Sequence, residues 1–254
     1  MTREEVVALL DALESGEIRA AQRQTDGRWV PNRAVKEAIL EAFRLGVDLE
    51  TSAGPLAFRD KDTLPPRRPP KGVRVVPGGT AIRRGAYLAR GVIVAPPAWI
   101  NVGAYVDEGS LVDSHALVGS CAQIGRRVHL SAAAQIGGVL EPVGAVPVVI
   151  EDDVFVGGGA GVYEGVCVRS RAVLAAGTIL TSSSVVFDLV DEREIRGTAD
   201  APLTIPEGAV VVPGTRGASG EWARARGLAL AAPVIVKYRD AKTDAKTALE
   251  SALR

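Results

Sequence analysis

Aliphatic residues recur at every sixth position through the middle of the chain. The series runs without a miss from Ile82 to Ile136, and it resumes at Ile150 and continues to Val186. A period of six fits neither an α-helix, whose faces recur every 3.6 residues, nor a single alternating strand. It indicates successive faces of a stacked coil, with three hexads in each triangular turn and small residues at the corners. The pattern therefore predicts a mainly β fold, a left-handed parallel β-helix.

The segments on either side of this repeat have different patterns, and three regions are predicted. Residues 1–70 are expected to form an N-terminal helical cap and a stiff proline-rich linker. Residues 71–215 form the β-helix. Residues 216–254 form a C-terminal extension, with a strand at 234–236 and a basic helix over 240–254.

Two helices are predicted in the cap. Thr2 and Glu5 have the spacing of a capping box, and an apolar stripe follows them. A second helix is expected to begin after Asn32 and to end at Gly46. The pair Asp26 and Gly27, between the two helices, is typical of a hairpin turn.

The six-residue period is interrupted twice. Ile136 and Ile150 are 14 residues apart, two more than a pair of hexads, which predicts a two-residue insertion and an external loop near 141–149. Loops on solenoids often carry function. Beyond Val186 the register is lost in a charged excursion, and Ile205 is expected to restore a final coil.

Composition narrows the class of protein. Only 4% of the 254 residues are aromatic, which suits a narrow interior without room for large rings. The formal net charge is zero, so there is no electrostatic reason to expect nucleic acid as a partner. The sequence offers neither the apolar core of a signal peptide nor an apolar run of about 18 residues. We therefore expect a cytoplasmic protein without membrane association, in which Cys121 and Cys167 are reduced.

Metal chemistry is not expected. One class of hexapeptide-repeat protein binds zinc through three histidines, but this chain has only His115 and His129. Their separation of 14 residues is not a multiple of the 18-residue coil, so the two side chains should not stack on one face. No glycine-rich phosphate loop is recognised either. The motifs alone indicate a hexapeptide-repeat protein, either an acyltransferase or a non-catalytic scaffold.

Longer segments resemble one family closely. They include Gly103–Gly109, the pair Val112 and Asp113, Val118–Gly125, and Ile136–Pro142, and the likeness extends to both ends of the chain. These segments resemble tetrahydrodipicolinate N-succinyltransferases. The resemblance implies a homotrimer that transfers succinyl from succinyl-CoA to an amine in the diaminopimelate and lysine pathway. It also implies small-molecule substrates and active sites in the grooves between neighbouring prisms.

The resemblance also assigns roles to residues that bind or activate the acceptor. Asp113 matches the aspartate that contacts the acceptor, and a carboxylate there can take the proton of the attacking amine. Arg74 matches the substrate-binding arginine, and Arg83 is retained in the family-like pair Ile82 and Arg83. Their guanidinium groups suit the two carboxylates of the acceptor. Some relatives carry a glutamate where this chain has Gly161, so we take Glu164 as the second catalytic candidate. An ordinary outward coil residue is an equally good interpretation of Glu164.

Coil counting places Asp113 and Glu164 on different faces of one prism, so we expect them to meet across subunits. The candidates for contacts with the CoA cosubstrate are Ser131, Gly137, Lys237 and Lys242, with Arg239 and Lys246 as further basic residues near the end of the chain. Backbone amides near 131–138 are expected to stabilise charge on the thioester oxygen. No tightly bound cofactor and no metal are expected.

Two alternatives remain at this stage. An N-acetyltransferase of the same pathway would differ only in how the site holds the acyl group. A non-catalytic hexapeptide-repeat scaffold would have the same coil without the chemistry.

Overall fold

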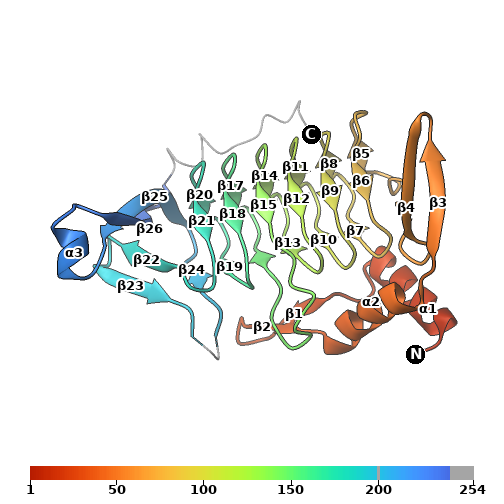
Figure 1. The fold of residues 1–254 in the computed structure, drawn as a ribbon, viewed down its shortest axis with the longest axis horizontal. Coiled ribbons are helices and arrows are strands. Elements are labelled where there is room, and N and C mark those ends of the chain that lie inside the picture. The colour runs from red at the N-terminus through yellow and green to blue at the C-terminus, as the bar shows by residue number, and fades with distance from the viewer. Residues whose placement is uncertain (199–200, 241–254) are drawn as a thin grey trace.

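The computed structural model describes residues 1–198 and 201–240, and its central feature is a three-sided prism of short parallel strands (Figure 1). Each coil contributes one strand to each of three sheets, and strands one coil apart pair in register. The prism is the predicted left-handed parallel β-helix.

We name the three faces of the prism by what lies on them. The cap-covered face contains β7 (Tyr87–Leu88), β10 (Tyr105–Val106), β13 (Gln123–Ile124), β16 (Val149–Ile150), β19 (Cys167–Val168) and β24 (Thr204–Ile205). The Asp113 face contains β5 (Arg74–Val75), β8 (Ile93–Val94), β11 (Leu111–Val112), β14 (His129–Leu130), β17 (Phe155–Val156) and β20 (Val173–Leu174). The Glu164 face contains β6 (Ala81–Ile82), β9 (Trp99–Ile100), β12 (Leu117–Val118), β15 (Gln135–Ile136), β18 (Gly161–Val162) and β21 (Ile179–Leu180).

The interior of the prism explains the six-residue period. Each two-residue strand turns its second residue inward, and these aliphatic side chains are almost completely buried in one continuous core. Small residues four places later, such as Ala104 and Ala116, are buried at the corners. The residue three places later has a left-handed backbone, with φ of 73° at Gly103 and 62° at His115. A side chain at Gly103 would lie 2.8 Å from Ile39 of the cap, so this corner requires glycine.

The predicted two-residue insertion is wrong. Gln123 pairs with Val149, 26 residues later instead of the usual 18, so the insertion has eight residues. Ile136 and Ile150 lie on successive faces, in β15 and β16, and are therefore separated by one hexad plus the insertion. The inserted residues form an external loop at one corner, and the strands on either side remain in register.

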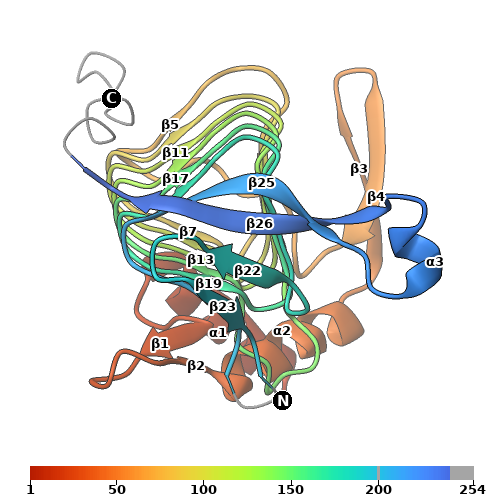
Figure 2. The same cartoon turned by 90° about the vertical axis from the view of Figure 1, so that its left-hand side faces the viewer.

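The N-terminal cap lies against the cap-covered face (Figure 2). It contains α1 (Arg3–Ser15), β1 (Ala21–Arg23), β2 (Trp29–Pro31) and α2 (Arg33–Leu45). The predicted capping box of Thr2 and Glu5 and the predicted cap at Asn32 are both present. The apolar stripes of the two helices form a second core, which includes Val102 and Cys121 of the prism.

An exposed hairpin that the sequence analysis did not predict lies between the cap and the prism, and it is formed by β3 (Asp48–Ala53) and β4 (Leu56–Lys61). The Pro-rich linker follows this hairpin and packs on the first coil, where the Arg67 guanidinium donates to the Ala86 carbonyl.

The final coil predicted at Ile205 is confirmed, because β24 pairs with β19. The excursion before it contains β22 (Val185–Asp188) and β23 (Arg193–Arg196). β25 (Ala209–Gly217), α3 (Glu221–Arg224) and β26 (Ala229–Tyr238) follow, and β26 contains the predicted strand at 234–236. The predicted basic helix falls almost entirely on residues outside the described ranges. Within those ranges, no helix has both the length and the apolar character needed to cross a membrane.

Replacing one inward leucine should destabilise the prism far more than replacing an exposed one. Leu180 is completely buried, whereas Leu189 is 62% exposed. Leu180→Ala should lower the free energy of unfolding by about 2–5 kcal/mol because it leaves a cavity that the stacked coils cannot close. Leu189→Ala should change it by less than about 0.5 kcal/mol. Denaturant unfolding followed by circular dichroism measures both, and equal effects would contradict the proposed role of the guide residues.

Candidate active site

Asp113 directly follows β11 and lies on the outer surface of its face. Its backbone N–H pairs with the Leu130 carbonyl, and Ser131 makes the same contact with Val156 one coil later. Asp113 and Ser131 therefore occupy the same outward position on adjacent coils. The Asp113 carboxylate accepts a hydrogen bond from the Ser114 N–H at 2.6 Å, which fixes its orientation.

Arg74 belongs to the same face. It is exposed at the start of β5, and it pairs in register with Ile93, which in turn pairs with Leu111. Arg74 and Asp113 are thus two coils apart, roughly 10 Å along the prism at the usual spacing between strands. Of the predicted residues, the structure brings Asp113, Ser131 and Arg74 together on one face.

Glu164 lies on the turn that follows β18, on a different face, as the sequence predicted. Its Oε2 atom accepts hydrogen bonds from the Ser182 N–H at 3.1 Å and from the Ser182 hydroxyl at 2.5 Å. Glu164 and Gly137 line a hollow of about 560 Å³, together with Glu141 and Pro142 of the inserted loop. The structure therefore places Gly137 beside Glu164 and not beside Ser131.

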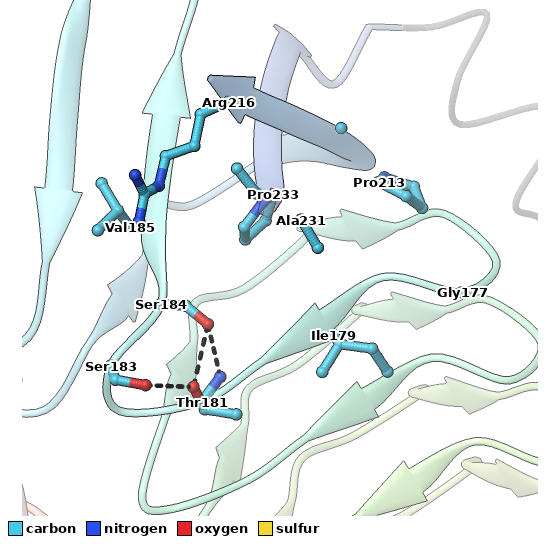
Figure 3. A pocket seen from close by; sticks show the side chains of 12 residues that line it. Gly177, Ile179, Thr181, Ser183, Ser184, Val185, Pro213, Arg216, Ala231 and Pro233 are labelled. Atoms are coloured by element: carbon cyan, nitrogen blue, oxygen red, sulfur yellow. Dashed lines mark hydrogen bonds between the residues drawn. The ribbon is translucent and has the colours of Figure 1, made fainter. Parts of the chain in front are cut away.

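A second hollow of about 310 Å³ lies farther along the Glu164 face. Thr181 lines both hollows, so the two adjoin at this residue. Figure 3 shows Ser183 and Ser184 hydrogen-bonded to Thr181, and Arg216 of β25 at one side, beside Val185. The predicted candidates did not include Arg216 or Thr181. The run of hydroxyl residues at 181–184 was the available signal for Thr181, whereas Arg216 is brought here only by the β25–β26 hairpin.

The remaining predicted residues lie elsewhere. The Arg83 guanidinium donates to Asp60 at 2.6 Å and to the Leu64 carbonyl at 3.1 Å, near the base of the β3–β4 hairpin. The Lys237 ammonium pairs with Asp240 at 3.0 Å. Lys242 and Lys246 lie outside the described residues, and the Arg239 guanidinium donates to the Asp153 carbonyl at a prism corner. The assignments of these residues stay predictions.

Known proteins resemble the chain over nearly its full length. A family model for the N-terminal part of tetrahydrodipicolinate N-succinyltransferase matches residues 1–45, and one for the hexapeptide repeat of succinyl-transferase matches residues 147–182. A 2,3,4,5-tetrahydropyridine-2,6-dicarboxylate N-succinyltransferase from Rhodopseudomonas palustris (strain TIE-1) is 43% identical, over 99% of this chain and 90% of its own length. The enzyme of the same name from Azoarcus sp. (strain BH72) is 44% identical, over 99% and 89%. The chain belongs to the tetrahydrodipicolinate N-succinyltransferase family.

A solved structure agrees with the fold of this family member. It is that of a Campylobacter jejuni protein provisionally assigned as a 2,3,4,5-tetrahydropyridine-2-carboxylate N-succinyltransferase. The TM-score is 0.51 at 14% identity, over 98% of this chain and 65% of that one. At this identity the likeness supports the architecture alone.

This member of the family has Gly161 at the place where some relatives are expected to carry a glutamate. A side-chain carbon added at Gly161 would lie 2.4–2.8 Å from three atoms of the Tyr163 side chain. The Tyr163 ring therefore occupies the space that a longer residue at 161 would need. Tyr163 also lines the hollow that contains Glu164, so it is a site candidate that sequence reasoning did not identify.

Metal ligands do not cluster in the described part of this family member. Within residues 1–198 and 201–240, no three histidine, cysteine, aspartate or glutamate side chains are grouped to hold an ion. His129 lies within β14, while His115 lies at a corner with a left-handed backbone, so the two do not stack.

The two cysteines should be unreactive in the folded protein. Burial raises the pKa of the Cys121 and Cys167 thiols to about 12, so both stay protonated at neutral pH. Because the thiolate is the nucleophile, both should react with Ellman's reagent at pH 8 roughly a thousandfold more slowly than free cysteine. Full reaction should follow addition of denaturant. Rapid release of one equivalent of chromophore from the native protein would contradict this.

Glu151 should make the attachment of the cap to the prism sensitive to acid. Its buried carboxylate accepts hydrogen bonds from the Trp29 indole at 3.0 Å and from Arg169 at 2.7 Å. Burial alone would raise the pKa of Glu151, but these bonds and the charges of Arg169 and Arg23 lower it overall. Its contribution is therefore present above the unfolded pKa of about 4.3 and is lost as the pH falls through the folded value.

Glu151→Gln should lower the free energy of unfolding at pH 7 by about 1–3 kcal/mol, because a buried charge-assisted network loses its acceptor. The difference from the unaltered protein should shrink below pH 4. Glu194→Gln, at an exposed ion pair with Arg196, is the control and should have little effect. Denaturant titrations at several pH values measure both, and a difference that grows as the pH falls would contradict the assignment.

Proposed function

We propose that this chain transfers a succinyl group from succinyl-CoA to the amino group of hydrated tetrahydrodipicolinate, in the diaminopimelate and lysine pathway. The observation that carries the proposal is the division of the candidate residues between two faces of one prism, in a chain that matches named N-succinyltransferases over 99% of its length. A cytoplasmic location fits such a biosynthetic activity.

The active protein is proposed to be a homotrimer. A flat prism face has little concavity of its own, so a substrate needs a second wall. In a closed three-fold assembly, the Asp113 face of one copy lies against the Glu164 face of the next, and each of the three grooves has the same two walls. The groove then contains both carboxylates, which a single chain keeps on separate faces.

The acceptor is proposed to bind on the Asp113 face. Arg74 holds one of its carboxylates through a bidentate guanidinium contact, and Asp113 takes the proton of the amine as its nitrogen attacks the thioester carbonyl. The hydrogen bond from the Ser114 N–H holds the Asp113 carboxylate in position. The CoA thiolate leaves as the amide bond forms, and a proton returns to its sulfur.

The donor is proposed to lie along the Glu164 face, in the two adjoining hollows that Gly137 and Arg216 line. Backbone amides within residues 131–138 other than those of Ser131 and Gly137, whose N–H groups pair with the next coil, approach the thioester oxygen. Arg216 of this face, with Lys237 and Lys242 of the neighbouring copy, supplies positive charge for the CoA phosphates. Glu164 lies at the acyl end and is proposed as the second catalytic carboxylate. Arg83 is proposed to bind the acceptor at the other end of the groove. Its guanidinium also donates to the Asp60 carboxylate and the Leu64 carbonyl. The reaction needs neither a tightly bound cofactor nor a metal.

Removing the charge of Asp113 should abolish most of the turnover. With succinyl-CoA and the acceptor, Asp113→Asn should reduce kcat/KM by about 10²–10⁴-fold, because general acid and base catalysis is worth that much. Release of free CoA thiol measures the rate. Succinyl-CoA and acetyl-CoA are compared in parallel, and turnover of the acetyl donor alone would favour the N-acetyltransferase. Unchanged turnover by the variant, or none by the unaltered protein with either donor, would overturn the proposal.

Mixing two inactive variants tests whether neighbouring copies share each site. Asp113→Asn and Glu164→Gln are each expected to be nearly inactive alone. When they are coexpressed, a groove that combines the Asp113 face of one variant with the Glu164 face of the other is intact. Random three-fold assembly gives about a quarter of all grooves this composition, so activity should return to about that fraction. If the coexpressed protein is no more active than either variant alone, Asp113 and Glu164 do not belong to one site shared between copies.

A further inference from the structure

The β3–β4 hairpin has two chemically different surfaces. Residues directly opposite each other in an antiparallel pair share a face, so the register assigns each side chain to one surface. On one surface Lys61 pairs with Asp48 at 2.7 Å, and Arg59 pairs with Glu50. The opposite surface, here called the apolar surface of the hairpin, consists of Leu49, Thr51, Ala53, Leu56 and Phe58, with Asp60 at its base.

The apolar surface has no partner within the described part of the chain. Leu49, Leu56 and Phe58 are 52%, 60% and 51% exposed. Every residue of the two strands except Lys61 is exposed, so the hairpin contributes almost nothing to either core. A two-stranded hairpin in water is only marginally stable alone, and this one keeps its large apolar groups in solvent. Such a surface requires a partner.

The position of the hairpin indicates where that partner lies. Asp60 is on the apolar surface, and its carboxylate contacts Arg83, which directly follows β6 of the Glu164 face. The apolar surface therefore opens on the side of the Glu164 face. In Figure 2 the hairpin stands beside the prism on the same side as α3, and in Figure 1 the two mark opposite ends of the row of coils. On the face between them, Trp99 and Ile179 are also exposed.

We propose that the β3–β4 hairpin is an arm that grips a second copy of this chain. The proposal rests on the homotrimer of the proposed function, and it adds the contact that holds each neighbour in place. Prisms related by an axis parallel to their length lie at the same height. The arm, which stands at the N-terminal end of one prism, therefore meets the first coils of the Asp113 face of the next copy. Its apolar surface continues the exposed apolar positions of the Glu164 face.

A charge placed on the apolar surface should weaken assembly without unfolding the chain. Phe58→Asp and Leu56→Asp should each raise the dissociation constant of the trimer by roughly thirtyfold or more, as expected for a buried anchor residue. Leu189→Asp is the matched control, because Leu189 is equally exposed but lies after β22, away from the arm, and it should assemble normally. Sedimentation velocity over a range of concentrations measures the three variants and the unaltered protein.

Two further measurements distinguish a variant that is unfolded from one that is folded but does not assemble. Circular dichroism and the slow reaction of Cys121 report whether each variant is folded. Hydrogen exchange of the unaltered protein should show protected amides at 48–61 in the trimer and loss of that protection in Phe58→Asp.

The proposed role of the hairpin would be contradicted if the Phe58→Asp variant assembles as tightly as the control, or if the hairpin amides are unprotected in an intact trimer. Assembly is measured without substrate, so failure of catalysis does not affect this result. Conversely, a trimer with protected hairpin amides but no N-succinyltransferase activity would support the proposed arm and contradict the proposed function.

Discussion

Each two-residue strand of the prism has to lie directly over the strand one coil earlier, and the rest of the structure depends on this in-register stacking. The backbone groups of a strand find their partners only in the neighbouring coils, so a shift of one residue would turn every inward side chain to the outside. The narrow interior accepts aliphatic side chains of similar size, and the corners accept small residues such as Ala104 and Ala116. The outward residue of each strand is free of both requirements. It can therefore differ from coil to coil.

This freedom allows the three faces to do different work. The cap-covered face is joined to the N-terminal cap through Cys121 and through the hydrogen bond that the Trp29 indole donates to Glu151. The other two faces carry the candidate catalytic residues. Asp113 and Glu164 do not approach each other within one chain, and this separation is the physical reason for proposing a site built from two copies.

The sequence predicted the features that follow from local repetition, and it failed where contacts are set by tertiary structure. The guide residues, the capping box at Thr2 and the final coil at Ile205 have local signatures, and all are confirmed. The 14 residues between Ile136 and Ile150 were interpreted as two hexads plus two residues, whereas the structure has one hexad plus eight. The six-residue period does not distinguish the two cases. Without an intervening guide residue, a two-residue and an eight-residue insertion look the same.

The candidate site divides in the same way. The outward direction of Asp113 followed from its position next to Val112. Coil counting also separated Asp113 from Glu164, but the assumed two-residue insertion put Glu164 on the cap-covered face instead of the face that contains β18. By contrast, Arg216 reaches the hollow near Thr181 only because β25 and β26 fold back beside the last coils. The Tyr163 ring over Gly161 depends on a rotamer, which no spacing reveals.

The corner insertion makes loop length independent of the geometry of the scaffold. Val149 pairs with Gln123 as though the eight extra residues were absent, yet Glu141 and Pro142 of the loop form part of the wall around Glu164. The loop is therefore an exchangeable module: its size and chemistry can be altered, in evolution or by design, to change the wall of the proposed acyl site while the candidate carboxylates keep their positions.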